Sequence, residues 1–154
     1  MGNIGAVRVH PTNPNIALVA AIGDPFRPTN ARGVYRTTDG GATWQRTLFV
    51  SDSTGAVDVE FNAGDPSVLY AAMWRAERKP WTIISGAMEG GIYKSTDGGA
   101  TWAKLTNGLP NGLVGKANIA VSRANPSRVW VLLEAKPGMG LYRSDDGGTS
   151  FSLI

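Results

Sequence analysis

The sequence predicts an all-β fold built from three consecutive units of four antiparallel strands. A segment at residues 33–44 recurs nearly verbatim at residues 91–102 and returns, with changes, at residues 140–151. Each copy follows a second repeated element, in which a short alternating strand leads through an Asn-Pro or Asp-Pro turn into an apolar run. The 20 glycines and 9 prolines agree with many short strands joined by turns.

The first two strands of each unit differ in their patterns. Alternating apolar residues mark the first strand at Val7 and Val9, at Val57 and Val59, and at Ile119 and Val121. Because successive side chains of a strand point to opposite faces, such alternation is typical of a strand with two different sides. The proline turn ends this strand, since proline fixes φ and removes a ladder donor. The second strand is a near-continuous apolar run, as in residues 68–73, which predicts burial on both faces.

An Asp-Gly-Gly turn joins the third and fourth strands of each unit. Glycine tolerates positive φ, and the aspartate can accept hydrogen bonds from nearby backbone N–H groups. The repeats begin at residues 33, 91 and 140, so each unit is somewhat longer than the about 40–45 residues of a propeller blade. We therefore predict one β-propeller segment over residues 1–154, with blades at about 7–50, 57–106 and 119–154.

Connection lengths distinguish the two ends of each blade. The proline turns and Asp-Gly-Gly hairpins are short and similar in every blade, whereas the connections from second to third strand differ in length. In an antiparallel meander, successive connections alternate between the ends, so the short turns share one end and the variable loops share the other. Because binding residues concentrate on variable loops of a rigid scaffold, we expect function at the variable end.

Composition argues against several classes of partner. The net charge of +3 arises from 15 basic and 12 acidic residues that are dispersed, and no basic block with interleaved aromatics indicates nucleic acid. The longest apolar run, residues 16–22, is too short to cross a membrane, and the N-terminal residues lack the pattern of a signal peptide. With no cysteine and a single histidine, His10, neither a metal site nor a cofactor is expected.

The hairpin segments match the pattern Ser/Thr-x-Asp-x-Gly-x-Thr-Trp, and through it the chain resembles the Asp-box, or bacterial neuraminidase repeat (BNR), propellers. The matching residues are Thr37, Asp39, Gly41 and Trp44, then Ser95, Asp97, Gly99 and Trp102, then Ser144, Asp146, Gly148 and Phe151. The third box departs from the pattern, with serine and phenylalanine in its last two places. An active site needs different residues converging on one point, so we interpret these recurring boxes as structural.

The sequences of residues 56–58, 74–81 and 141–148 are similar to those of large bacterial proteins described as sortilin-like or "glycosyl hydrolase" repeat proteins. This resemblance implies a secreted, extracytoplasmic parent, of which the chain would be an internal three-blade fragment. The partners would then be the remaining blades of the parent or further copies of the chain. A truncated or designed piece that assembles with itself is a further possibility.

The segment at residues 74–90 is the most distinctive part of the variable end. Tryptophan suits stacking on sugars, and arginine with aromatic neighbours suits the grip of a peptide. The candidate residues for a glycan or peptide ligand are Trp74, Arg75, Arg78, Lys79, Trp81, Arg27 and Arg32. The alternative is that Trp74 ends a core strand while the basic side chains are merely solvated.

The leading functional hypothesis is a non-catalytic recognition or scaffold module that binds carbohydrate or protein. The alternative is a fragment of a xyloglucanase-like or sialidase-like glycoside hydrolase that shares its catalytic carboxylates with missing blades. Such hydrolysis needs two carboxylates about 5–10 Å apart. The acidic residues at the variable end, Asp24, Asp52, Glu77 and Glu89, show no spacing that pairs them, so we assign no catalytic residue to this chain.

Overall fold

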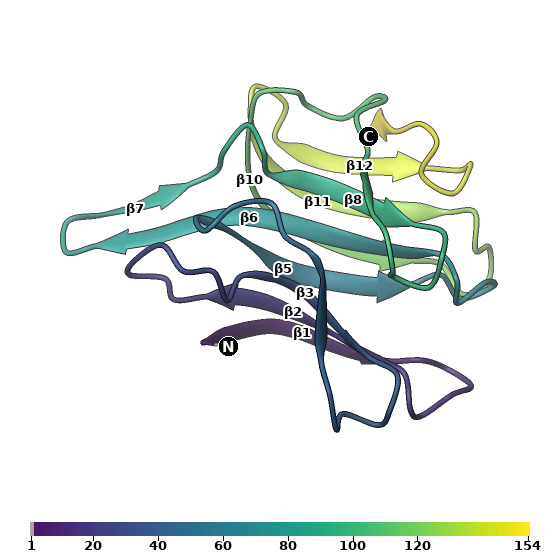
Figure 1. Ribbon diagram of the computed structural model, residues 1–154. Coiled ribbons are helices and arrows are strands. Elements are labelled where there is room, and N and C mark those ends of the chain that lie inside the picture. The colour runs from purple at the N-terminus through teal and green to yellow at the C-terminus, as the bar shows by residue number, and fades with distance from the viewer. Residues whose placement is uncertain (1) are drawn as a thin grey trace.

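The computed structural model describes residues 2–154, and these residues form three antiparallel sheets without any helix. Each sheet holds its main strands in chain order, and one extra strand, β7, pairs with β6 in the middle sheet. The sheets follow one another through the molecule, from β1 at the bottom of Figure 1 to β12 at the top. This arrangement confirms the all-β fold of three consecutive four-stranded propeller blades.

The three blades have the following strands. Blade 1 contains β1 (Asn3–Val9), β2 (Ala17–Gly23), β3 (Gly33–Thr37) and β4 (Gln45–Leu48). Blade 2 contains β5 (Thr54–Phe61), β6 (Leu69–Lys79), β7 (Thr82–Ser85), β8 (Gly91–Ser95) and β9 (Ala103–Lys104). Blade 3 contains β10 (Leu113–Val121), β11 (Val129–Lys136), β12 (Gly140–Ser144) and β13 (Ser152–Leu153).

The first strand of each blade begins earlier than the apolar alternation indicates. The register shifts between Ile4 and Ala6 in β1, between Ala56 and Asp58 in β5, and within residues 114–117 of β10. A bulge of this kind places an extra residue opposite the partner strand and interrupts the two-residue period. In β1 and β10 the alternation therefore becomes visible only after the bulge, although the strand already pairs before it. In β5, Val57 lies in the bulge itself, so it packs toward blade 3 while Val59 packs toward blade 1.

Two apolar layers hold the blades together. One lies between blades 1 and 2 and contains Leu18, Val34 and Met73; the other lies between blades 2 and 3 and contains Tyr70, Ile92 and Val131. Residues 69–73 of β6 are fully buried, as the prediction of burial on both faces requires. In β11, however, buried and exposed side chains alternate, because the second face of blade 3 has no neighbour within residues 2–154.

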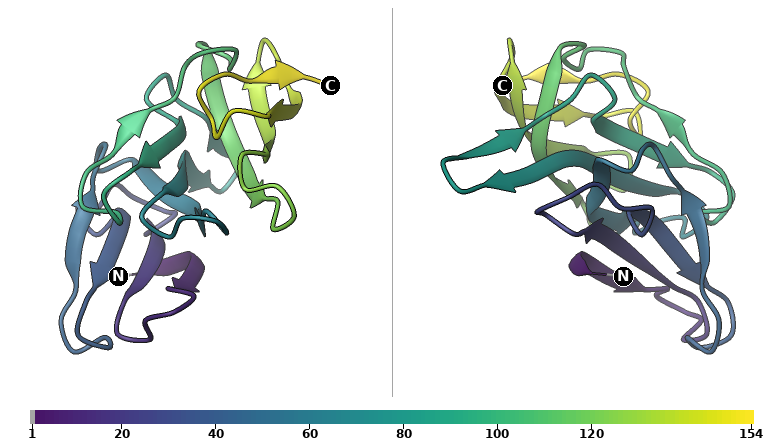
Figure 2. Two further views of the ribbon diagram at one scale, coloured as in Figure 1. Left: turned by 90° about the vertical axis from the view of Figure 1, so that its right-hand side faces the viewer. Right: turned by 60° about the vertical axis from the view of Figure 1, so that its left-hand side comes forward.

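The segment that follows Met73 is a β-hairpin, where the sequence indicated a loop. Strand β6 continues to Lys79, Pro80 and Trp81 form a two-residue turn, and β7 returns antiparallel with Arg78 opposite Ile83. A two-residue connection is the commonest hairpin turn and keeps the strands in register. The hairpin projects beyond the other strands in Figure 1 and Figure 2.

No helix in residues 2–154 is long and apolar enough to cross a membrane.

Candidate functional site

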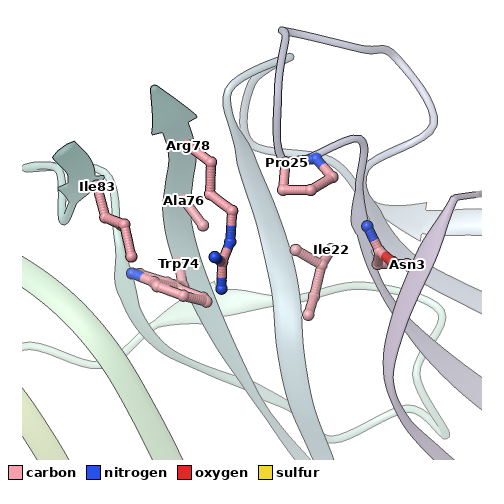
Figure 3. Close-up of a pocket in the computed structure, with 7 residues that line it drawn as sticks. All are labelled: Asn3, Ile22, Pro25, Trp74, Ala76, Arg78 and Ile83. Carbon is pink, nitrogen blue, oxygen red and sulfur yellow. The ribbon is translucent and has the colours of Figure 1, made fainter. Parts of the chain in front are cut away.

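A pocket of about 240 Å³ opens between blades 1 and 2 at the end that carries the variable loops. Strands β1 and β2 and the loop after β2 supply one wall, and the β6–β7 hairpin supplies the other, as Figure 3 shows. The residues that line it are Asn3, Ile22, Pro25, Trp74, Ala76, Arg78 and Ile83. Apolar walls with a few polar groups are typical of small-ligand sites.

Strand alternation decides which hairpin residues reach this pocket. Trp74, Ala76 and Arg78 are two residues apart, so they share one face of β6 and all line the cavity. Arg75 and Lys79 lie on the opposite face, where both form ion pairs with Glu77. The structure therefore divides the basic and aromatic candidates of this segment into two groups.

The indole ring of Trp74 is held in place by a chain of hydrogen bonds. Its Nε1–H donates to Ser85 Oγ over 2.9 Å, and the Ser85 hydroxyl donates to Glu134 Oε2 over 3.0 Å. The chain thus runs from the pocket through β7 to β11 of blade 3. Because these hydrogen bonds fix the orientation of the indole ring before a ligand binds, the Trp74 side chain loses little conformational entropy when an apolar ligand surface packs on it.

The opposite wall is braced by Arg32, which is 1% exposed. Its guanidinium donates to the carbonyl oxygens of Ile22 at 2.7 Å and Asp24 at 2.5 Å, and reaches that of Ala76 in blade 2 at 3.4 Å. Burial lowers the pKa of Arg32 from its ordinary value. The assignment of Arg32 to ligand binding is therefore corrected: the side chain is buried, both of its terminal nitrogens donate to backbone carbonyl oxygens, and it connects the two walls.

Two further candidates lie outside the pocket. Arg27 is exposed on the loop after β2, where its Nε donates to Asp24 Oδ2 over 2.9 Å. Trp81 is 81% exposed at the tip of the β6–β7 hairpin, so it is not a core residue. Of the seven candidates, the structure brings only Trp74 and Arg78 together in the cavity.

The other lining residues escaped the sequence analysis because they are ordinary strand and turn residues. Asn3, Ile22 and Pro25 come from blade 1, while Ile83 comes from β7, which was not predicted as a strand. The signal that was present is topological, since the start of a first strand and the end of a second strand share one end of a meander. Glu134 accepts the last hydrogen bond of the chain that starts at the Trp74 indole, and neither the sequence nor the strand order indicated this role.

The acidic residues of the variable end do not form a catalytic pair in this pocket, because none of its seven lining residues is a carboxylate. The Lys79 ammonium beside Glu77 lowers the pKa of that carboxyl group. Hydrogen bonds from Ser51 and Thr54 lower the pKa of Glu89, and the Phe26 N–H lowers that of Asp24. A general acid of a glycosidase needs the opposite shift, toward a raised pKa.

The carboxylates of the three Asp-box aspartates accept hydrogen bonds from residues of their own turns. Asp97 accepts hydrogen bonds from the Ser95 hydroxyl and from the N–H and hydroxyl of Thr101. Asp39 and Asp146 make the same contacts in their boxes. These bonds favour the ionised form and lower the pKa of all three carboxyl groups. The geometry is that of a hairpin brace.

Comparisons with known proteins agree with these repeats. The family model described as BNR/Asp-box repeat matches residues 35–46 and 93–104. The xyloglucanase of Hypocrea jecorina (strain QM6a) is 27% identical over 164 residues, which cover 99% of this chain and 18% of that protein. The chain spans 13% to 20% of the length of the curated relatives that it matches.

Solved structures are similar to the chain in fold. The GH74 enzyme of Niastella koreensis matches with a TM-score of 0.70 and 22% identity, over 97% of this chain and 22% of that chain. YCF48 bound to D1 peptide matches with a TM-score of 0.60 and 16% identity, over 99% of this chain and 39% of that chain. The chain thus carries two matched Asp-box repeats, has the fold of part of a β-propeller, and matches a part of these larger proteins.

Proposed function

We propose that this chain supplies a glycan-binding wall to a β-propeller that acts on xyloglucan or a related β-glucan. The observation that carries this proposal is the pocket between blades 1 and 2, in which Trp74 is held by Ser85 beside Arg78. Support also comes from relatives named as xyloglucanases, which match almost the whole chain. They favour the glycoside hydrolase alternative over a purely non-catalytic module. A polysaccharide substrate of this kind implies an extracytoplasmic location.

The chemistry of the pocket suits a neutral sugar. The apolar faces of pyranose rings pack on aromatic rings, and the Trp74 indole and Ile83 offer such a surface. Arg78 supplies guanidinium donors to the pocket, and the side-chain amide of Asn3, which already donates to the Gly23 carbonyl oxygen, has a second N–H; both can meet ring hydroxyl groups. The fixed indole and the braced opposite wall give a site that needs little reorganisation on binding.

The catalytic carboxylates belong elsewhere in the assembled propeller under this proposal. The carboxylates of Asp24, Glu77 and Glu89 have lowered pKa values, and each is engaged by hydrogen bonds within the chain. Glycoside hydrolysis requires an acid and a second carboxylate on either side of the scissile bond. This chain therefore contributes substrate binding, and the reaction class of the complete propeller is glycoside hydrolysis.

Calorimetric titration with xyloglucan oligosaccharides tests the proposal. We expect Arg78→Ala and Trp74→Ala each to weaken binding about tenfold or more, the equivalent of about 1.4 kcal/mol. Trp81→Ala is the matched control, because it removes the same kind of side chain outside the cavity. Arg78 is exposed, so its variant retains the fold even where Trp74→Ala does not. Unchanged affinity in folded Arg78→Ala and Trp74→Ala, or no binding by the wild-type chain, refutes the proposal.

A second candidate function is peptide recognition by the projecting hairpin. Trp81 is 81% exposed and Ile83 53% exposed, an unusual apolar display on a strand tip. The structural neighbour YCF48 is bound to a peptide. A peptide-array screen distinguishes the two candidates: binding that Trp81→Ala abolishes while xyloglucan affinity persists assigns peptide recognition to the hairpin tip.

A further inference from the structure

Two Asn-Gly pairs lie in the connection between blades 2 and 3. Strand β9 ends at Lys104 and β10 begins at Leu113, and residues 105–112 between them contain Asn107-Gly108 and Asn111-Gly112. Every other asparagine of the chain is followed by a residue with a side chain. Glycine after asparagine favours cyclisation of the backbone onto the side-chain amide, because no side chain shields the glycine N–H.

The reaction of such a pair is intramolecular. The backbone nitrogen of the glycine loses its proton and attacks the asparagine Cγ; a C–N bond forms, and the Cγ–Nδ2 bond breaks with release of ammonia. Water then opens the resulting succinimide at either carbonyl group and leaves aspartate or isoaspartate. The asparagine side chain has to turn toward the next backbone nitrogen, so contacts that hold the amide or the backbone slow the reaction.

The first pair is held by the Asp-box turn of blade 3. Asn107 Nδ2 donates to the Thr149 carbonyl oxygen over 3.1 Å, and the Asn107 carbonyl oxygen accepts from the Phe151 N–H over 3.1 Å. Gly108 packs so closely on this turn that a Cβ there would overlap the Phe151 carbonyl oxygen. Cyclisation at Asn107 therefore breaks a hydrogen bond of the leaving amide and moves the backbone away from blade 3.

The second pair lacks these restraints. Asn111 is exposed, and within residues 2–154 no hydrogen bond holds its side-chain amide or the Gly112 N–H. The pair lies outside the strands, since the ladder of β10 begins with Leu113 opposite Lys136. A Cβ on Gly112 would lie 2.5 Å from the Lys136 carbonyl oxygen, so packing at the start of β10 requires the residue that hinders cyclisation least.

We propose that Asn111 is a site of spontaneous deamidation in the folded chain, and that Asn107 is protected by its contacts with blade 3. The nucleophile is the Gly112 nitrogen, the leaving group is the Asn111 amide as ammonia, and water is the only co-reactant. The proposal does not rest on glycan binding, because only the backbone and one exposed side chain take part.

The site lies beside a second cavity of the variable end. Leu113 and Lys136 line a cavity of about 280 Å³ between blades 2 and 3, and this cavity shares Ile83 with the pocket that contains Trp74. Deamidation of Asn111 places a negative charge near this cavity. In the isoaspartate form the main chain also gains a methylene group, directly before β10. The charge and the loop geometry next to the candidate site thus change as the protein ages.

Peptide mapping of incubated protein tests the proposal. Trypsin cleaves after Lys104 and Lys116, so one peptide, residues 105–116, contains both Asn-Gly pairs, and each pair serves as the control for the other. The folded chain is incubated at mildly alkaline pH, which favours loss of the glycine N–H proton, and fragmentation of the peptide in a mass spectrometer assigns the conversion of amide to acid. We expect Asn111 to react at least about tenfold faster than Asn107, which has two hydrogen bonds to lose.

Two further samples show whether the fold causes the difference. In the chain unfolded in urea, the two pairs should react at similar rates, because the contacts of Asn107 with blade 3 are lost. In folded Asn111→Gln, only the slow reaction at Asn107 should remain, since the longer side chain does not form the succinimide; circular dichroism checks that the fold is retained. Equal rates at the two asparagines of the folded chain, or a faster reaction at Asn107, overturn the proposal. An intact peptide from the folded chain, after the unfolded chain has been converted, overturns it as well.

Discussion

Replacing Asp58 with alanine should loosen the junction of all three blades. Asp58 lies in β5 at the bulge and is 6% exposed. Its Oδ2 accepts from the Ile119 N–H of blade 3 over 2.9 Å, and its Oδ1 accepts from the Val59 N–H over 3.0 Å. Arg8 of blade 1 approaches Oδ1 to 3.7 Å. One buried carboxylate thus connects residues from each blade.

The expected loss of stability follows from these contacts. A hydrogen bond to a charged group contributes about 1.5–3 kcal/mol, and alanine leaves two buried N–H groups without an acceptor. We therefore expect Asp58→Ala to lower the free energy of unfolding by about 3 kcal/mol or more. That is a large part of the about 5–15 kcal/mol that stabilises a typical domain. For a chain of this size, it corresponds to a fall in melting temperature of about 6–12 °C.

Urea denaturation and thermal melts followed by circular dichroism measure this loss. Asp58→Asn is the matched control, because the amide keeps one acceptor oxygen and should recover part of the stability. Arg8→Ala should cost less, since Arg8 is half exposed and Glu60 is its nearer partner. A melting temperature of Asp58→Ala within about 2 °C of the wild-type value would refute the reasoning, because it would show that the junction does not depend on this carboxylate.

Two further outcomes follow from the turns and hairpins. The three box aspartates have pKa values lowered by folding, so their contribution to stability is complete above the unfolded value of about 3.9 and is lost as the pH falls below it. Melting temperatures should therefore fall between about pH 5 and pH 2, and a rise over this range would contradict the brace. Gly33 and Gly40 both have positive φ, but a Cβ on Gly33 would overlap the Leu48 carbonyl oxygen, whereas one on Gly40 has its nearest neighbour at 3.4 Å. Gly40→Ala should cost about 1–2 kcal/mol and Gly33→Ala clearly more in urea denaturation, and equal losses would show that the overlap relaxes freely.

The repeats made the fold predictable, because each blade carries the same turns and strand patterns. The proline turns, the Asp-Gly-Gly hairpins and the two-sided burial of β6 all have local sequence signals. The β6–β7 hairpin lacked such a signal, since Pro80 and Trp81 are not typical hairpin-turn residues. The one-sided burial of β11 could not be read either, because its apolar residues do not reveal which face has a neighbour.

The candidate site was predictable in part. The variable end and two of its residues, Trp74 and Arg78, were identified from loop lengths and residue type. Arg32 was assigned wrongly, because sequence alone does not distinguish an arginine that meets solvent from one that caps backbone carbonyls. Glu134 and Asp58 were not identified, since their hydrogen bonds cross between blades at sequence distances that no motif records.

The order of the blades also determines which parts of the chain unfold locally at the lowest free-energy cost. Blade 2 is the only blade within residues 2–154 that packs against a neighbour on both faces, and its strand β6 is fully buried over residues 69–73. In a stack where each unit contacts only adjacent units, stability is a sum of unit and interface terms, so the outer units open at a lower cost than the middle one. Amide protons should accordingly exchange slowest in β5, β6 and β8 and faster toward both ends of the chain. Thermal fluctuations would then fray blades 1 and 3 while the central sheet persists as the last folded unit.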